Sequence, residues 1–199
     1  MNRINILFLT FFIVLQVKAQ DRNMSIYDID NLLGDYINIK NHPKSLGVNL
    51  KIRPPLRWTI KEGDRPHIVK KFVKGNGEFF GITITELPTF NTKDETRLLM
   101  SNVDFEQAIL DEFKILDDVK VTERDLIVID NYPALEFTLE GFYKMDGEQI
   151  LLIFKFWIIN YEDKSIKLTG TATDNPKNLD PVYDLIFNSI IFPDQYEEY

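Results

Sequence analysis

The chain of 199 residues contains no cysteine and only two histidines. The absence of cysteine excludes a thiol nucleophile, thiolate-ligated zinc or iron–sulfur sites, and a disulfide framework. The spacing between His42 and His67 matches no short metal-binding motif, and none of the serines lies in a Gly-x-Ser-x-Gly sequence. We therefore expect a fold held by packing alone, with no catalytic residue identifiable, no bound metal and no cofactor.

Long apolar runs are also scarce, and the one at the start has the features of a secretory signal. Met1–Ala19 has a basic start at Arg3, an apolar stretch over residues 4–17, and small-residue spacing before Gln20. This stretch is shorter than the roughly 20 residues needed to cross a bilayer. We expect cleavage after Ala19 and a secreted protein, periplasmic or extracellular, with an uncleaved anchor as the alternative. The Ala-Gln ending resembles exported proteins of the Bacteroidota.

Positive charge is in short supply, with 23 Lys and Arg against 31 Asp and Glu. Cleavage after Ala19 removes two basic residues and no acidic one, so 21 basic residues would face 31 acidic ones, a net charge of −10. Such a protein repels nucleic acid and anionic lipid overall. We expect no nucleic-acid partner and, after cleavage, no transmembrane segment.

The first half of the chain contains signals for two helices and a hairpin. A helix capped by Ser25 is expected to end before His42. Residues 68–73 form a β-branched run that turns at residues 75–77 into an alternating strand around residues 82–84, which predicts a hairpin. A second helix is predicted over residues 104–116, because apolar residues recur there at helical spacing: Phe105, Ala108, Ile109, Phe113 and Leu116.

The second half predicts a strand meander followed by a helix. Strands are expected over residues 119–129, 134–142, 148–159 and 165–173, separated by short Asp, Asn and Gly turns that make neighbours antiparallel. A final helix is expected to begin at Asp180 as N-cap, with Pro181 in its first turn. One side of that helix is apolar: Leu179, Val182, Tyr183, Ile186, Phe187 and Ile190.

The segment Ile150–Ile159 is apolar on both faces apart from Lys155, whereas a strand with one wet face would alternate. We therefore predict an α+β fold: an α/β/α sandwich with a central antiparallel β-sheet covered by helices on both faces. The predicted organisation is a signal peptide over residues 1–19, a partly helical N-terminal extension over residues 20–47, and a single domain over residues 48–199.

Lys155 needs a partner, because a lone buried ammonium is strongly destabilising. If the Asp146-Gly147 turn sets the register, Lys155 faces Glu136, Thr138 and Glu140 on the neighbouring strand. We expect a structural ion pair of Lys155 with Glu136 or Glu140. The alternative is that Lys155 lies in a pocket and binds an anionic ligand.

Charge is unevenly distributed along the chain. Residues 51–74 contain eight basic and two acidic residues, a net charge of +6, which leaves −16 for the rest of the mature chain. We predict a partner-binding patch for an acidic protein or ligand, made of Arg53, Arg57, Trp58, Arg65, Lys70, Lys71 and Lys74. The alternative is a solvated hairpin whose lysines protect an edge strand.

Four short segments, in this order, resemble the PsbP-like superfamily, which includes the photosystem II accessory subunit, Ran-binding Mog-type proteins and small exported bacterial relatives. They are Arg53-Pro-Pro-Leu-Arg-Trp58, Tyr132-Pro-Ala-Leu-Glu-Phe137, Leu168-Thr-Gly-Thr-Ala-Thr173 and Asn188-Ser-Ile-Ile-Phe192. The resemblance covers about Val48 to Phe192. It implies an α/β/α sandwich that serves as an accessory or binding module, usually without catalysis, and it implies no particular partner. No ligand residue transfers by position, and residues 21–47 depart from the family.

Composition, motifs and resemblance together favour a non-catalytic secreted or periplasmic accessory module that binds a protein partner or a ligand. Two alternatives stay open. One is an extracytoplasmic hydrolase, because a sequence does not reveal which scattered polar groups converge in a cleft. The other is a carrier that holds a small apolar ligand between sheet and helices.

Overall fold

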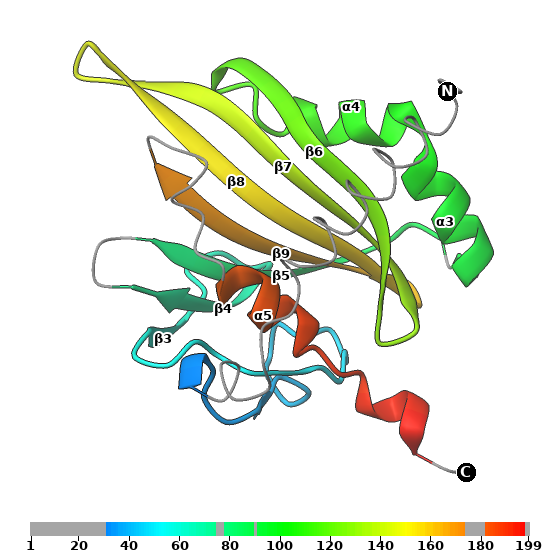
Figure 1. Ribbon diagram of the computed structural model, residues 1–199. Coiled ribbons are helices and arrows are strands. Elements are labelled where there is room, and N and C mark those ends of the chain that lie inside the picture. The colour runs from blue at the N-terminus through cyan, green and yellow to red at the C-terminus, as the bar shows by residue number, and fades with distance from the viewer. Residues whose placement is uncertain (1–30, 75–77, 90, 174–181, 198–199) are drawn as a thin grey trace, which may run out of the picture. The chain divides into compact units, whose positions relative to one another are not determined.

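A computed structural model describes residues 31–74, 78–89, 91–173 and 182–197. The chain divides into two units, Met1–Leu32 and Leu33–Tyr199, and the second contains the sheet. Among the described residues, seven strands form one antiparallel sheet in the order β3-β4-β5-β9-β8-β7-β6 (Figure 1). Their bounds are β3 Thr59–Glu62, β4 Ile68–Val73, β5 Phe79–Glu86, β6 Asp117–Ile129, β7 Tyr132–Met145, β8 Glu148–Tyr161 and β9 Lys164–Thr173.

The predicted meander is confirmed, and its turns explain why these strands pair in sequence. Two residues separate β6 from β7, β7 from β8, and β8 from β9. Two-residue hairpin loops need backbone with positive φ, which Asn, Asp and Gly adopt most readily. The structure has this conformation at Asp130, Asn131, Asp146, Gly147 and Glu162. The predicted hairpin of β4 and β5 is also confirmed by its antiparallel register.

The N-terminal part of the second unit is irregular. A small separate sheet pairs β1, Ile37–Asn38, with β2, Lys51–Ile52. Most of the predicted first helix, including its Ser25 cap, lies outside the described residues. The prediction that this helix continues to just before His42 is wrong, because Ile37 lies in β1. At Ile37 the chain forms a strand in place of the predicted helix. The strand pairs with β2, where Ile37 is opposite the fully buried Ile52.

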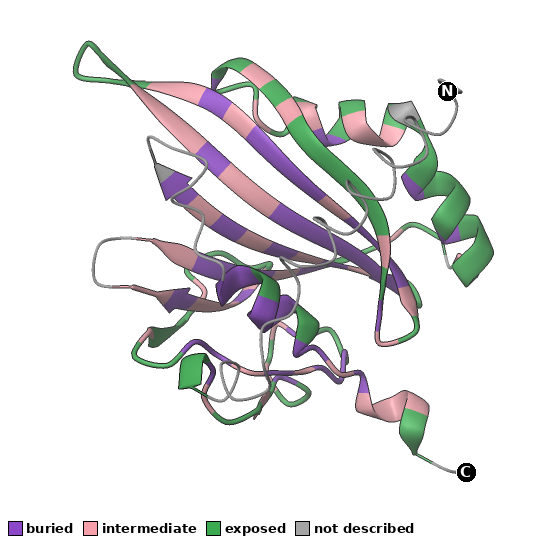
Figure 2. Cartoon of the chain, in the orientation of Figure 1, coloured by how far each residue is buried: buried purple, intermediate pink, exposed green. Residues whose placement is uncertain are grey.

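Strand β8 sends large apolar side chains to both faces of the sheet. On the odd-numbered face, Trp157 stacks on Phe187 of α5, Val182–Asn188, with ring centroids 4.5 Å apart. On the even-numbered face, Phe156 belongs to a core cluster with Met100 and Ile109. Met100 comes from α3, Lys93–Ser101, and Ile109 from α4, Val103–Asp111. Burial along β7 and β8 therefore does not alternate: buried residues follow one another in runs, the longest being Phe156–Tyr161 at the end of β8 (Figure 2).

These elements confirm an α+β protein built on a central antiparallel sheet. They do not establish the predicted helical cover of both faces, because α3 and α4 pack on β6, β7 and β8, and a cleft lies open over β5 and β9. This part of the sheet is left uncovered because its side chains are polar. On this face β5 and β9 present side chains such as Thr83, Lys167 and Thr169, which need no apolar cover.

The C-terminal elements return to the sheet. Helix α5 is followed by a short 3₁₀ turn, Pro193–Tyr196; the backbone N–H of Phe192 just before it and the Gln195 side chain within it donate to the turn residue Asp130. The predicted N-cap of the last helix, Asp180, lies outside the described residues. Within the part of the chain that is described, no helix has the length and apolar character needed to cross a membrane.

Candidate binding cleft

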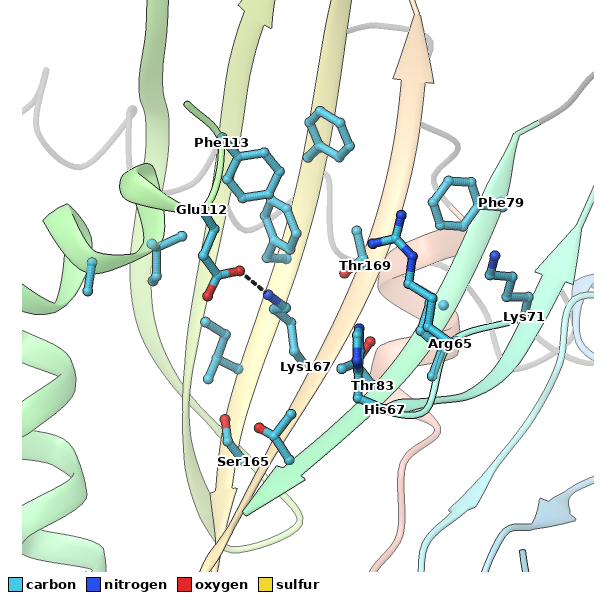
Figure 3. A pocket seen from close by; sticks show the side chains of 18 of the residues that line it. Arg65, His67, Lys71, Phe79, Thr83, Glu112, Phe113, Ser165, Lys167 and Thr169 are labelled. Atoms are coloured by element: carbon cyan, nitrogen blue, oxygen red, sulfur yellow. Dashed lines mark hydrogen bonds and ion pairs between the residues drawn. The ribbon is translucent and has the colours of Figure 1, made fainter. Parts of the chain in front are cut away.

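A cleft with a volume of about 600 Å³ lies on the sheet face opposite α5 (Figure 3). Its floor is formed by β5 and β9, one wall by α4, the residues just after it and the middle of β8, and the other wall by β4 and the loop before it. Sites for small organic molecules typically occupy roughly 300–1,000 Å³. The cleft is therefore of the right size for such a ligand.

The register of four strands places four different side-chain types in one row across the floor. Lys71 of β4 is opposite Gly81 of β5, Gly81 is opposite Thr169 of β9, and Thr169 is opposite Phe156 of β8. The row changes from a cation through a glycine and a hydroxyl to an aromatic ring. The row thus runs from a cation to a buried ring, and the Lys167 ammonium, paired with Glu112, lies 6.0 Å from the centroid of that ring.

Side-chain hydroxyls cover the middle of the floor, because alternate residues of β5 and β9 point to this face. Thr83 and Thr85 come from β5, and Ser165 and Thr169 come from β9. Thr83 is opposite Lys167, and Thr85 is opposite Ser165. Within the described ranges these four hydroxyls have no hydrogen-bond partner in the protein, so they are available to a ligand.

Phenylalanines form the apolar wall. The Phe113 ring centroid is 5.2 Å from that of Phe154 and 5.3 Å from that of Phe156. Phe105 and Ala108 of α4 line the same side. Phe113, Phe154 and Phe105 are only partly buried, so this wall presents apolar surface to the cleft.

Positive charge exceeds negative charge around the cleft. Lys71 Nζ lies 2.7 Å from Asp64 Oδ1, and Lys167 Nζ lies 2.5 Å from Glu112 Oε2. The hydrogen bond from Lys71 is the main cause that lowers the pKa of the Asp64 carboxyl. The Arg65 guanidinium has no hydrogen bond or ion pair with any residue that the structure describes, and its charge also helps to lower the pKa of Asp64. Figure 3 shows the Arg65 side chain extended over the sheet in the direction of Thr169 and Phe79.

The predicted basic patch is divided between different surfaces. Arg65 and Lys71 line the cleft. Lys70 follows the opposite parity to Lys71 along β4, so it points to the other face and pairs with Glu62. Lys74 shares that parity and lies 5.8 Å from the centroid of Trp58.

The remaining patch residues lie apart from the cleft. Arg53 is structural, since its Nε donates to the Gly34 carbonyl at 2.8 Å. Arg57 is exposed and has a positive φ of 67°. Trp58 makes an edge contact with Tyr183 of α5. Of the seven residues predicted for the patch, the structure therefore brings Arg65 and Lys71 to the cleft.

Lys155 lies on the α5 face, where it pairs in register with Thr138. Its Nζ is 2.9 Å from Glu136 Oε1 and 2.5 Å from Asp184 Oδ1 of α5. Glu140 has a different partner, Lys120, at 3.3 Å. Burial lowers the pKa of Lys155, and the bonds to Asp184 and Glu136 more than compensate, so the net shift is upward.

The acidic partner of Lys70 leads to a pH prediction. Hydrogen bonds, first from Lys70 and then from His42, lower the pKa of Glu62 from 4.5 to about 2. A depressed carboxyl pKa stabilises the fold above the unfolded pKa and loses that effect as the pH falls through the folded value. We expect the urea concentration at the midpoint of unfolding to be lower for Glu62→Gln than for wild type near pH 6. Near pH 2 we expect the two midpoints to be equal. A difference that persists near pH 2 would contradict this assignment.

The two histidines lie in different environments. His42 Nε2 is 2.6 Å from Glu62 Oε2, which gives this histidine a structural contact. His67 lines the cleft. Among the described residues, no cluster of three or more His, Asp or Glu side chains is arranged to hold a metal ion.

Several cleft residues were not predicted as site residues. Lys167, Glu112, Phe113 and Phe79 come from elements far apart in sequence, and no motif connects them. One signal was available in β9. Ser165, Lys167 and Thr169 alternate with the fully buried Ile166 and Leu168, which marks one polar face on a central strand.

No protein-family model and no curated protein matches the sequence. The structure is similar to cyanobacterial PsbP from Synechocystis sp. PCC 6803, with a TM-score of 0.53 and 13% identity, covering 81% of this chain and 92% of that one. It is also similar to the Saccharomyces cerevisiae Ran-binding protein Mog1p, with a TM-score of 0.54 and 10% identity, covering 81% of this chain and 97% of that one. The protein therefore has a PsbP-like fold, as its sequence motifs predicted.

Proposed function

We propose that this protein is an exported, non-catalytic binding module whose cleft binds a small anionic ligand. The observation that carries the proposal is the Arg65 guanidinium, which makes no hydrogen bond or ion pair among the described residues and extends over a floor of hydroxyls without protein hydrogen bonds. A guanidinium offers several donors in a planar fork that matches a carboxylate or phosphate. The signal-like segment Met1–Ala19 supports the exported address.

Charge contrast supports an anionic ligand. The described lining residues include three basic side chains and one acidic one, with His67 counted as neutral, and Asp64 beside Lys71 adds a second acidic group, so the cleft has one surplus positive charge. The whole chain has a net charge of −8. A positive cleft in an acidic protein concentrates the field and attracts anions to that one place.

The contacts within the cleft favour binding over catalysis. A serine or threonine nucleophile needs a base within about 3 Å. Among the described residues, His67 has no hydrogen bond to Ser165 or to a threonine hydroxyl of the floor. Mog1p, named as a Ran-binding protein, provides a precedent for this fold in a binding role.

Charge reversal at the cleft tests the proposal. The probe is 1-anilinonaphthalene-8-sulfonate, an anion whose fluorescence rises in apolar sites, titrated into the folded full chain. We expect one saturable site, weakened at least tenfold by Arg65→Glu, because the variant replaces a cation of the cleft with an anion. Binding should also weaken with added salt.

The matched control is Arg97→Glu. Arg97 is an exposed residue of α3 that does not line the cleft, and its replacement changes the net charge by the same amount. We expect this variant to bind the probe within twofold of wild type. Equal losses in both variants, or no loss in Arg65→Glu, would overturn the proposal, provided that thermal melts show both variants folded.

A further inference from the structure

We infer that the ligand of the cleft is a linear acyl carboxylate, with its head group at Arg65 and Lys71 and its chain along the phenylalanine wall. This inference rests on the binding function proposed above and adds the chemical class of the ligand. Three features carry it: the length of the cleft, its floor, and the chemistry of its two ends.

The row of residues across the floor sets the length of the ligand. Lys71, Gly81, Thr169 and Phe156 lie on four successive strands. Neighbouring strands are about 4.8 Å apart, so the row spans roughly 14 Å from cation to ring. A single extended chain with a charged end fits this path, whereas a compact anion reaches only one end of it.

Glycine keeps the path open between the two ends. A Cβ at Gly81 would meet only the Phe79 ring, at 3.6 and 3.9 Å, which are ordinary contact distances. The backbone there is extended rather than left-handed, so no turn requires the glycine. Gly81 is buried beside the Phe79 ring, and its consequence is a position without a side chain on the floor between Lys71 and Thr169.

The two ends of the cleft offer different groups to a ligand. At one end two cations share a single exposed carboxylate, Asp64: Lys71 pairs with it at 2.7 Å, and Arg65, which has no hydrogen bond or ion pair among the described residues, interacts with it electrostatically. At the other end Phe113 and Phe154 present partly exposed rings. A carboxylate pairs with the first end, and each methylene removed from water at the second end strengthens binding by about fourfold.

An extended peptide is disfavoured by the same floor. Strand addition needs an unpaired strand edge. The floor strands have none, because β5 pairs with β4 and β9, and β9 pairs with β5 and β8. The floor therefore offers side-chain hydroxyls in place of backbone groups, which suits a small molecule.

Displacement of the fluorescent probe by chain-length analogues tests the inference. The competitors are octanoate, decanoate and dodecanoate, with dodecyltrimethylammonium as the cation of equal chain length, all below their micellar concentrations. We expect dodecanoate to bind at least tenfold more tightly than octanoate and at least tenfold more tightly than the ammonium. Affinity independent of chain length, or equal affinity for the cation, would overturn the inference.

A matched pair of variants locates the chain. Ala108 is an exposed residue of α4 that lines the apolar side, and Gln107 is its exposed neighbour outside the cleft. Ala108→Trp should weaken dodecanoate binding at least fivefold, and Gln107→Trp should leave it within twofold. Equal effects of the two variants would contradict a chain at this wall.

The outcomes separate the ligand class from the binding function. If the probe binds in an Arg65-dependent manner and dodecanoate does not displace it, the cleft still binds anions and the acyl assignment is wrong. If the probe does not depend on Arg65, the proposed function itself fails.

Discussion

Replacing Trp157 with alanine is expected to lower the free energy of unfolding by about 3–5 kcal/mol, the usual effect of removing a large buried aromatic side chain. Trp157 is fully buried, and its ring lies 4.5 Å from Phe187 and 6.1 Å from Phe80. It therefore joins α5 to the centre of the sheet. The loss corresponds to a decrease in Tm of roughly 6–20 °C for a domain of this size.

Two further variants make the Trp157 measurement specific. Trp157→Phe keeps a ring and removes the indole Nε1, which is buried without a hydrogen-bond partner among the described residues, so we expect a change of about 1 kcal/mol or less. Trp58→Ala, at the half-buried second tryptophan, should cost about 1 kcal/mol. Urea unfolding measures all three. A loss below about 1 kcal/mol for Trp157→Ala would contradict the packing of α5 on β8.

Replacing Gly170 with alanine is expected to cost about 1–3 kcal/mol through overpacking. A Cβ at this position would lie 2.7 Å from Tyr183 Cδ2 and 2.8 Å from Cε2. The Tyr183 ring is fully buried, and its hydroxyl donates to the Thr171 carbonyl at 2.8 Å, so the ring is held in place. The added methyl group therefore forces α5 away from β9.

Gly81→Ala is the matched control, because Gly81 lies on the neighbouring strand β5 in the same sheet. Its added Cβ meets the Phe79 ring only at ordinary contact distance. Alanine also restricts the unfolded chain, so we expect this variant to be neutral or more stable by up to about 1 kcal/mol. If both glycine variants lose the same stability, the close approach of Tyr183 to Gly170 is not the cause.

The sequence was most informative where local chemistry alone determines structure. The turns at Asp130-Asn131 and Asp146-Gly147 adopt the positive φ that short hairpins need, and they made β6, β7 and β8 predictable. Helix α3 was missed because its apolar residues are consecutive, Leu98–Met100, and do not recur at helical spacing; within this described helix only Thr96 and Met100 are buried. Its capping box was nevertheless present in the sequence, with Thr92 Oγ1 accepting from the Glu95 backbone N–H at 3.3 Å.

The cleft was not predictable, because it depends on register between distant segments. Gly81 and Thr169 become neighbours through the pairing of β5 with β9, which no turn determines. The basic patch failed to gather on one surface for a simpler reason. Counting charge along residues 51–74 ignores strand alternation, which sends Lys70 and Lys71 to opposite faces. Because alternate residues of a strand point to opposite faces, the sequence of residues 68–73 alone is enough to predict that the patch is divided.

The central claim is that an anionic chain lies across β4, β5, β9 and β8 in the cleft. Backbone amide NMR spectra of the full chain during titration with dodecanoate test it most directly. We expect saturable shifts at Lys71, Gly81, Thr169 and Phe156 that fit one dissociation constant. Saturable shifts confined to the opposite face, around Tyr183 and Lys155, or the absence of saturation at the cleft residues, would contradict it.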